Sequence, residues 1–559
     1  MNDEDPFPAP RRKLAIIGTG SSGLISLKFA IDELVDWDIV AFEHTDSVVG
    51  RWGRPYPGFV STSTKFTTQF ASYPKYDAGV NEDGGSSRAE FFREGEYGDY
   101  LLEFANEFSL SEKIKFRHSL RAIRWDEQDL RWKLTIQSLV EGESPSTEES
   151  FDAVILCSGL HAEPKPIDVD IPTVPTQQLF MKDGLEQIRN RKVVVMGGGE
   201  SGVDHAVRLA KPELNNQVFL SLQSGIRVSP RYHPIRGVPS DFLRNRLLLS
   251  IHENLRNRIG QKFVELRIRY EDTFRRWFPA KKLVAKNALS PTANPGDVAA
   301  RRKAWTWKLT QTAKDDLFNM FHNKSDDFLE HVARGTIQIV GKPVDRNANE
   351  FFGYQSADRV AIAPDLVVPS VGFRPTLESL SNGAIRLEDF YLGCLSIRFP
   401  NLFAVGFARP IIGNIPSMSE MQAAYIVGLL SGRVQPESNI AERHRQQSLI
   451  RKERYSMLNQ ELIYPVEMFP YCDQLARLMN RYPTLADIGS MQAWLRMHLA
   501  PASTIHYFLH DPKARQAIER IPICMPSLLV AFLVLLKPID FLYRISLGWK
   551  FARRGGGAD

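Results

Sequence analysis

The chain has 559 residues, of which 43% are hydrophobic and 24% are charged, which is typical of a globular protein and excludes a disordered or collagen-like chain. Its 70 Lys and Arg residues exceed its 65 Asp and Glu residues by only five, and so small an excess over a long chain does not indicate a nucleic-acid groove. At roughly 100 to 200 residues per domain, this length predicts several domains or one large split unit.

Residues 1–12 contain acidic residues and prolines in place of the basic start and apolar run of a secretory signal, so we expect a short polar tail. The four cysteines lie far apart without a Cys-x-x-Cys pair. This spacing predicts neither a disulfide framework nor a cysteine zinc site, and the scattered single histidines predict no other metal site. A cytoplasmic protein is expected.

A strand, a glycine turn, a helix and a second strand are predicted twice, over residues 13–43 and again over residues 191–221. Such units open nucleotide-binding domains of the α/β class. The sequence therefore predicts two Rossmann-like dinucleotide-binding domains.

The first turn, Gly18-Thr-Gly-Ser-Ser-Gly23, has the Gly-x-Gly-x-x-Gly spacing of a dinucleotide site. Its first glycine makes the turn, its second lets a pyrophosphate approach the backbone, and its third lets the helix pack against the strand. Glu43 ends the next strand, where a carboxylate accepts hydrogen bonds from ribose hydroxyls. This site favours FAD or NAD over NADP.

The second turn, Gly197-Gly-Gly-Glu-Ser-Gly202, repeats the spacing, but no carboxylate follows at the end of the next strand, which runs into Gln223. Because no carboxylate would repel a 2′-phosphate and because Arg227 and Arg231 lie just downstream, the second site favours NADPH, with NADH close behind. That the two arginines are ordinary surface or interdomain charges stays open.

Strands predicted at residues 365–373 and 401–407 indicate that the chain returns to the first sheet after the second domain. We expect a polar tail at residues 1–12 and the first part of an FAD-binding domain at residues 13–170. An inserted NAD(P)H-binding domain with a helical insertion is expected at residues 171–335, followed by the return segment of the FAD-binding domain at residues 336–440. A helical C-terminal region is expected at residues 441–559.

The C-terminal region contains an apolar stretch at residues 521–536, which is shorter than the about 20 residues of a membrane-spanning helix and is interrupted by Pro522 and Pro526. An interfacial membrane anchor is the favoured interpretation. A buried core helix and a true membrane span are the alternatives.

Two dinucleotide sites in one chain suit a flavin that takes hydride from a nicotinamide. A dithiol reductase would also need a redox-active cysteine pair, which this sequence lacks. Oxygen, a quinone or another one-step acceptor remains for the reduced flavin.

The motifs of this chain resemble, in order, those of flavin-containing monooxygenases, which are class B flavoprotein monooxygenases of the dimethylaniline N-oxide-forming type. The resemblance runs from about residue 13 to about residue 515. Its motifs are Gly18-Thr-Gly-Ser-Ser-Gly23, Glu43, Val49-Gly-Arg-Trp52, residues 62–74, Cys157-Ser-Gly159, Gly197-Gly-Gly-Glu-Ser-Gly202-Val-Asp204, residues 413–423 and Tyr464-Pro-Val-Glu467.

The resemblance implies FAD in the first domain and NADPH in the second, and a reduced flavin that adds O2 as a C4a-hydroperoxyflavin. One oxygen atom would pass to the nitrogen or sulfur of a small lipophilic amine or sulfide. The implied FAD contacts are Gly18, Thr19, Gly20, Ser21, Ser22, Glu43, Arg51, Trp52, Thr62 and Ser63, with Gly23 in the same loop. The implied nicotinamide-dinucleotide contacts are Ser61, Thr62, Ser201, Gly202, Val203 and Asp204, with Gly197 and Gly199 in the loop, and Gln422 is a further cofactor-binding candidate.

Three departures from the family indicate a divergent branch. Thr62, the candidate catalytic residue, stands where the family usually has asparagine beside the flavin, and Gln223 stands where it usually has an arginine for the 2′-phosphate. The expected histidine before the second glycine turn is absent. An uncoupled NAD(P)H oxidase, a Baeyer-Villiger monooxygenase and a non-catalytic flavin-binding redox module therefore stay open, as does a homodimer.

Overall fold

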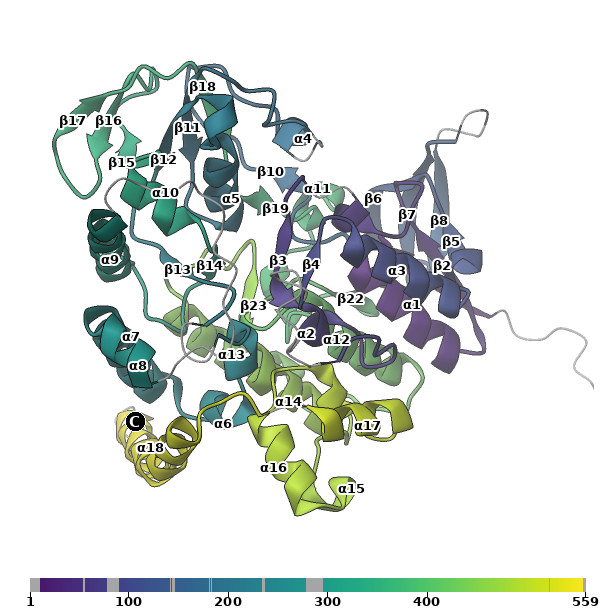
Figure 1. Cartoon of the computed structure of the whole chain (residues 1–559). Coiled ribbons are helices and arrows are strands. Elements are labelled where there is room, and N and C mark those ends of the chain that lie inside the picture. Colours follow the sequence, from purple (N-terminus) through teal and green to yellow (C-terminus); the bar gives the residue numbers. More distant parts are fainter. Residues whose placement is uncertain are drawn as a thin grey trace, which may run out of the picture.

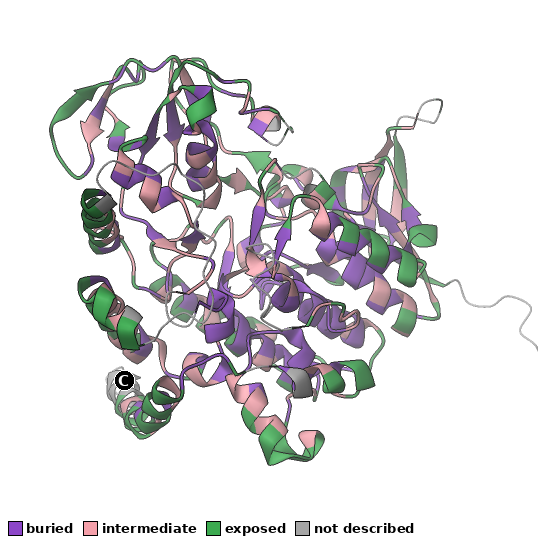
Figure 2. Cartoon of the chain, viewed as in Figure 1, coloured by how far each residue is buried: buried purple, intermediate pink, exposed green. Residues whose placement is uncertain are grey.

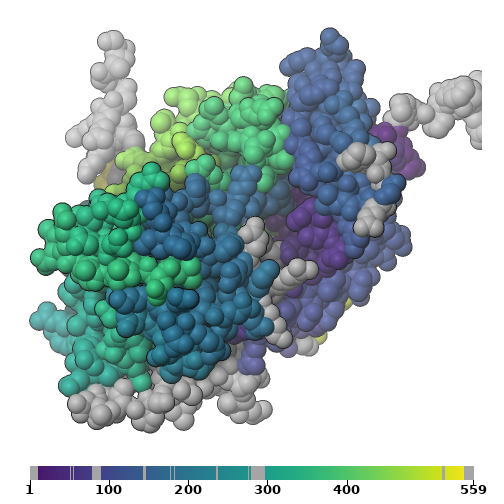
Figure 3. All heavy atoms as spheres, turned by 90° about the horizontal axis from the view of Figure 1, so that it is seen from above, coloured from purple at the N-terminus to yellow at the C-terminus, as the bar shows by residue number. Residues whose placement is uncertain are grey.

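The computed structural model describes residues 11–53, 56–77, 90–140, 142, 146–179, 181, 183–233, 237–277, 295–521 and 523–555. Two sheets with parallel central strands lie in separate lobes, and the helices of the C-terminal region pack below them (Figure 1). Seen from above, the second lobe in blue and teal lies beside the purple N-terminal segments (Figure 3).

The first sheet has the strand order β20-β21-β22-β9-β1-β2-β5. Its parallel centre consists of β22 (Leu402–Ala404), β9 (Ala153–Leu156), β1 (Arg12–Ile17), β2 (Trp37–Phe42) and β5 (Ile114–Lys115). Antiparallel β20 (Phe390–Tyr391) and β21 (Leu395–Ser396) complete one edge. The continuous apolar residues of β1 and β9 are buried because helices α1 (Ser21–Glu33) and α12 (Ile415–Leu430) pack against each other and the sheet.

A three-stranded antiparallel sheet extends this lobe with β6 (His118–Asp126), β7 (Arg131–Ser138) and β8 (Thr147–Phe151). The alternating pattern of β7 buries Trp132, Leu134 and Ile136 and leaves the residues between them more exposed.

The second sheet has the strand order β17-β16-β15-β12-β11-β18. Its parallel strands are β15 (Ile337–Pro343), β12 (Gln217–Ser221), β11 (Lys192–Met196) and β18 (Leu366–Pro369), and β16 (Glu350–Gly353) and β17 (Arg359–Ala361) are antiparallel. Helices α5 (Glu200–Leu209) and α10 (Phe328–Arg334) help to enclose its own apolar core. The expected class, two Rossmann-like domains with one inserted in the other, is confirmed.

One expectation about the return of the chain is wrong. Residues 365–373 were expected in the first sheet, but Val193 of β11 pairs with Leu366 of β18, so this strand closes the second sheet. An apolar strand that is buried on both faces fits the interior of either parallel sheet, and its sequence does not specify which. The chain re-enters the first sheet at β20 and β22.

Helices α6 (Arg246–Leu249), α7 (Glu253–Arg269), α8 (Glu271–Trp277) and α9 (Pro295–Gln311) form the helical insertion. The C-terminal region adds α13 (Ile440–Arg454), α14 (Met468–Leu478), α15 (Leu485–Ile488), α16 (Met491–Leu499), α17 (Pro512–Arg520) and α18 (Ser527–Gly555). Among the helices of the described ranges, none combines the length and apolar character needed to cross a bilayer.

Helix α18 is nevertheless apolar on its outer side. Leu533 and Leu536 are buried, whereas Leu528, Phe532, Val534, Leu535, Ile539, Phe541, Leu542 and Ile545 are exposed. Polar contacts hold the helix to the segment before α7: Lys537 donates to Ser250 and the backbone N–H of His252 donates to Asp540 at 2.6 Å. Figure 2 shows much of this helix in the green of exposed residues, and these include the apolar side chains just named.

Candidate functional site

The first glycine turn connects β1 to α1, and its geometry requires glycine at two positions. Gly18 has φ of +90°, and a side chain there would also meet the carbonyl oxygen of Cys157 at 2.9 Å. A Cβ on Gly23 would lie 1.8 Å from the carbonyl oxygen of Gly18, so only glycine lets α1 start this close to the strand. These are the turn and packing roles predicted for the first and third glycines.

Glu43 follows β2 and is buried beside Thr19 of this turn. One carboxylate oxygen accepts hydrogen bonds from the backbone N–H and hydroxyl of Thr19, and the other accepts both kinds of bond from Thr45. Burial by itself raises the pKa of Glu43, but the bonds from His44, Thr19 and Thr45 outweigh it and lower the pKa to about 2. The ionised carboxylate thus ties the second strand to the glycine turn.

The second glycine turn connects β11 to α5 and repeats this construction. Gly197 has φ of +119°, and a Cβ on Gly202 would lie 2.0 Å from the carbonyl oxygen of Gly197. A Cβ on Gly199 would meet nothing within 4 Å, which leaves space in front of the N-terminus of the 10-residue helix α5. Both turns fit a dinucleotide, because each offers a tight glycine turn before a helix N-terminus.

The predicted residues around the flavin lie on β3 (Val60–Thr64). The Ser61 hydroxyl donates to the carbonyl oxygen of Ser63 at 2.6 Å and accepts from the N–H of Phe92, so it is used within the protein. The hydroxyls of Thr62 and Ser63 are half-buried and have no hydrogen-bond partner among the described residues. Of the three, Thr62 and Ser63 can therefore offer a hydroxyl to a ligand.

Trp52 lies in the short helix η1 (Gly50–Gly53), where its ring packs edge-on against Tyr97, with 5.0 Å between the ring centroids. Arg51 precedes it, and its side chain lies outside the described part of the structure.

Two of the predicted cofactor residues have side chains that already contact other residues of the protein. Gln422 is fully buried in α12, accepts from the N–H of Gly406 at 3.0 Å and donates to the hydroxyl of Tyr471 at 2.8 Å. Val203 packs in the core of the second lobe. Gln422 therefore holds the end of the first sheet, and Val203 has only its backbone to offer a cofactor.

Contacts between the lobes bring the two glycine turns into one assembly. Asp204 of α5 accepts a hydrogen bond from Tyr56, which precedes β3. The guanidinium of Arg231 donates to the carbonyl oxygens of Val60 at 2.6 Å and Ser61 at 3.0 Å, and to Asp326 at 3.4 Å. Arg231 is thus a link between the lobes.

This geometry corrects the expectation that Arg227 and Arg231 would serve the 2′-phosphate. The guanidinium of Arg231 already binds β3 and Asp326, and buried Arg227 donates to the carbonyl oxygen of Asp315 at 3.1 Å. Gln223 is exposed beyond the end of β12. The alternative, interdomain or structural charges, is the one that the contacts support.

Sequence reasoning missed a buried charged pair beside β3. Asp241, in the short helix η4 (Ser240–Leu243), accepts from the N–H of Thr64 at 2.9 Å and from the ammonium of Lys324 at the end of β14 (His322–Lys324). Burial by itself raises the pKa of Asp241, but Lys324 and Arg244 outweigh it and hold the pKa below its usual range. No sequence spacing connects these residues, because the helical insertion separates them.

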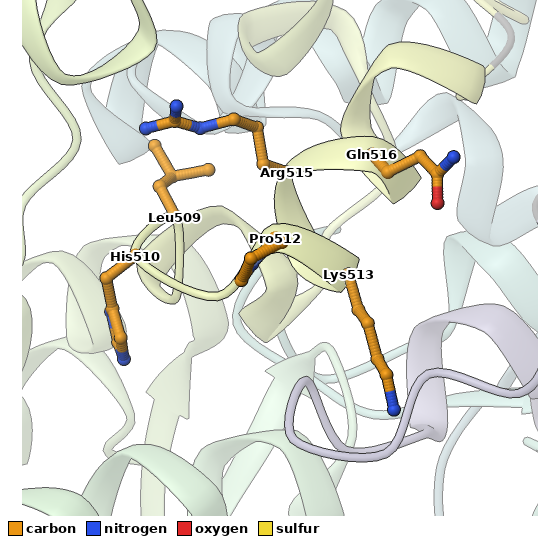
Figure 4. Close-up of a pocket in the computed structure, with 6 residues that line it drawn as sticks. All are labelled: Leu509, His510, Pro512, Lys513, Arg515 and Gln516. Atoms are coloured by element: carbon orange, nitrogen blue, oxygen red, sulfur yellow. The ribbon is translucent and has the colours of Figure 1, made fainter.

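A small cavity lies at this pair, and a wider recess lies elsewhere. The cavity has a volume of about 20 Å³ and is lined by Ser63, Thr67, Asp241, Arg244, Ile412, Gly413, Asn414 and Ala502. The recess, of about 510 Å³, lies at α17 and is lined by Leu509, His510, Pro512, Lys513, Arg515 and Gln516 (Figure 4). Only the cavity touches the predicted site. Among the described residues, no group of acidic, cysteine or histidine side chains is placed to hold a metal ion.

Comparisons with known proteins agree with these features. The family model described as flavin-binding monooxygenase-like matches residues 11–288. Flavin-containing monooxygenase 2 of Homo sapiens is 24% identical over 545 residues, covering 90% of this chain and 89% of that protein.

Two solved structures share the fold at 17% identity. A closed cyclohexanone monooxygenase has a TM-score of 0.55 and matches 85% of this chain and 98% of its own. An oxidised steroid monooxygenase bound to NADP has a TM-score of 0.54 and matches 84% of this chain and 97% of its own. The prediction of a flavin and a nicotinamide cofactor is confirmed at the level of the family. With its two glycine turns, its fold and these matches, the chain belongs to the flavin-binding monooxygenase family as a divergent member and is an oxidoreductase of the flavin-containing monooxygenase kind.

Proposed function

We propose that this protein is an FAD- and NADPH-dependent monooxygenase that oxygenates a nucleophilic nitrogen or sulfur atom of a small substrate. The observation that carries the proposal is that Arg231 and the Tyr56–Asp204 pair join two dinucleotide turns across β3, the strand of Thr62. In the balanced reaction, NADPH supplies two electrons, one atom of O2 enters the substrate and the other leaves as water with two protons. The bound flavin supplies the activation of O2.

The residues of this chain have binding and positioning roles in that reaction. Gly199 leaves room for a pyrophosphate before α5, and Glu43 fixes the first turn. The unpaired Thr62 hydroxyl is available to orient a polar group at the flavin edge, and burial of the neighbouring β3 residues Val60, Ser61 and Thr64 restricts water. The protein provides a protected site rather than a strong acid or base.

NADPH is proposed over NADH on the resemblance to the family and on the missing carboxylate after β12, where Gln223 is exposed. The occupied contacts of Arg227 and Arg231 give no separate support for a 2′-phosphate site. NADH is therefore the comparison that the kinetic test must include.

The test uses purified protein loaded with FAD and supplied with NADPH or NADH, a panel of sulfides and tertiary amines, and a panel of ketones. We expect one sulfoxide or N-oxide formed per NADPH and per O2 consumed. Consumption of NADPH with only hydrogen peroxide released would contradict the proposal and favour an oxidase. Lactone or ester formed from ketones alone would favour Baeyer-Villiger chemistry, and flavin binding without turnover would favour a redox module.

We also propose contact of α18 with a membrane surface, which the exposed apolar side chains of that helix support. The test is sedimentation with anionic phospholipid vesicles. The double variant Leu535→Lys and Phe541→Lys should stay in the supernatant, whereas Leu449→Lys, which changes another exposed leucine on α13, should sediment like the unchanged protein. Equal sedimentation of all three proteins would contradict the proposed membrane contact.

A further inference from the structure

The cavity beside Asp241 is built from four separate parts of the chain. β3 and α2 (Lys65–Thr68) contribute Ser63 and Thr67, the segment around η4 contributes Asp241 and Arg244, the turn after β23 (Ala408–Ile412) contributes Gly413 and Asn414, and the C-terminal region contributes Ala502. Its volume of about 20 Å³ suits a small polar group rather than a whole ligand. Since no residue of either glycine turn lines it, the cavity is separate from the pyrophosphate positions.

Most polar groups in this cavity already have partners. One oxygen of Asp241 accepts from Lys324, and the other accepts from the N–H of Thr64 and the hydroxyl of Thr67. The side chain of Asn414 donates to the carbonyl oxygen of Thr67 at 2.6 Å and accepts from the N–H of Ser417 at 3.0 Å. Asp241 is therefore committed to Lys324, to the backbone of Thr64 and to the hydroxyl of Thr67.

Arg244 differs from its neighbours in this respect. Its backbone is fixed, because its N–H donates to the carbonyl oxygen of Asp241 and its own carbonyl oxygen accepts from the N–H of Ala502. Its guanidinium has no hydrogen bond or ion pair to any described residue. Several more deeply buried arginines have a carboxylate partner, among them Arg208, Arg231, Arg246 and Arg256, whereas Arg227 donates to a backbone carbonyl.

No carboxylate of the described residues is hydrogen-bonded to the Arg244 guanidinium. Asp241 is engaged by Lys324, and Glu200 attracts both cations only through its charge. The half-buried guanidinium has lost part of its hydration without gaining a hydrogen-bonded anion, and an oxyanion entering the cavity would supply one. A carboxylate matches the two parallel N–H groups of a guanidinium, and the Ser63 hydroxyl can donate a further hydrogen bond.

We propose that Arg244 binds the carboxylate of the substrate, so that the substrate class is a carboxylic acid carrying the sulfide or amine to be oxygenated. The proposal rests on the proposed function for the oxygenation step, but not for the binding step. The carboxylate would enter the cavity while the rest of the molecule extends towards Thr62 and Ser63. Arg244 would then select acids over their neutral analogues.

The experiment compares a thioether carboxylic acid with its primary amide, using the FAD-loaded full chain. Dissociation constants come from equilibrium dialysis with oxidised enzyme, and kcat/KM comes from sulfoxide formation with NADPH. We expect the unchanged enzyme to bind and turn over the acid roughly 10- to 100-fold better than the amide. Arg244→Met should remove that preference and leave the amide constants unchanged, and Arg346→Met, which removes an exposed arginine, should keep it.

Other results would overturn the proposal. Equal affinity of the unchanged enzyme for the acid and the amide would contradict the proposal without any variant. An Arg244→Met enzyme whose only change is a higher KM for NADPH would also contradict it, because the anion bound by Arg244 would then belong to the nicotinamide cofactor. If Arg244→Met does not fold, Arg244→Lys must retain part of the acid preference. Acid binding without sulfoxide formation would contradict the proposed function while supporting the role of Arg244.

Discussion

The Nε atom of Arg231 donates to the carbonyl oxygen of Ser61 at 3.0 Å, which attaches the second lobe to β3, the strand of Thr62 and Ser63. The same guanidinium contacts Asp326, and both side chains are at most 10% exposed. A single side chain thereby couples the position of the nicotinamide-binding lobe to the position of Thr62.

Replacing Arg231 with methionine should destabilise this junction. The variant removes the guanidinium from Asp326 and from two strand carbonyls, and loss of one member of a buried ion pair costs about 3 to 5 kcal/mol. We expect a clearly lower urea midpoint and a higher KM for NADPH. Arg346→Met should change stability by less than about 0.5 kcal/mol, because the arginine and its partner Asp168 are 66% and 74% exposed. An unchanged midpoint for Arg231→Met would show that this link carries no stability.

Two alanine variants of the second glycine turn separate binding from packing. Gly199→Ala places a methyl group where nothing lies within 4 Å, so the protein should keep its melting temperature and bind NADPH more weakly. Gly202→Ala places its methyl group 2.0 Å from the carbonyl oxygen of Gly197 and should lower the melting temperature. The pair is measured by calorimetry and NADPH titration, and normal binding by Gly199→Ala would argue against a pyrophosphate at this turn.

Glu43 should make stability depend on acid pH. Its pKa falls from 4.5 in the unfolded chain to about 2 in the folded protein, so its contribution, on the order of 3 kcal/mol, is present above about pH 4.5 and lost as pH falls towards 2. Urea midpoints of apoprotein measured from pH 6 to pH 2.5 should therefore fall less steeply in Glu43→Gln than in the unchanged protein. Glu213→Gln, on an exposed carboxylate, serves as the control, and parallel curves for all three proteins would contradict the assignment.

Thr62 should influence how much of the oxygen consumed reaches the substrate. Thr62→Asn restores an amide with a donor and an acceptor, and we expect more sulfoxide per NADPH and less hydrogen peroxide. Thr62→Val keeps the shape without the hydroxyl and should release more peroxide. The ratio of product to peroxide, measured at saturating substrate, is the readout, and an equal ratio in all three proteins would exclude Thr62 from the chemistry.

The glycine turns and Glu43 could be predicted because their roles depend on spacing within one strand-turn-helix unit. The link from Arg231 to Ser61 could not, since it depends on how two lobes pack, and the same holds for Lys324 and Asp241 across the helical insertion. The strand β18 was placed in the wrong sheet because an apolar run buried on both faces fits either one. Sequence spacing thus indicates local turns well and long-range partners poorly.

The placement of β22 beside β9 has a consequence for how the protein is made. β9 ends at Leu156 and β22 begins at Leu402, so the first sheet lacks a neighbour strand until the ribosome has synthesised the entire second lobe. The second lobe, whose strands lie between Lys192 and Pro369, can fold meanwhile as a contiguous unit. The N-terminal third of the nascent chain therefore keeps an apolar strand edge exposed while the second lobe is synthesised. We expect chaperones to bind this exposed edge during translation.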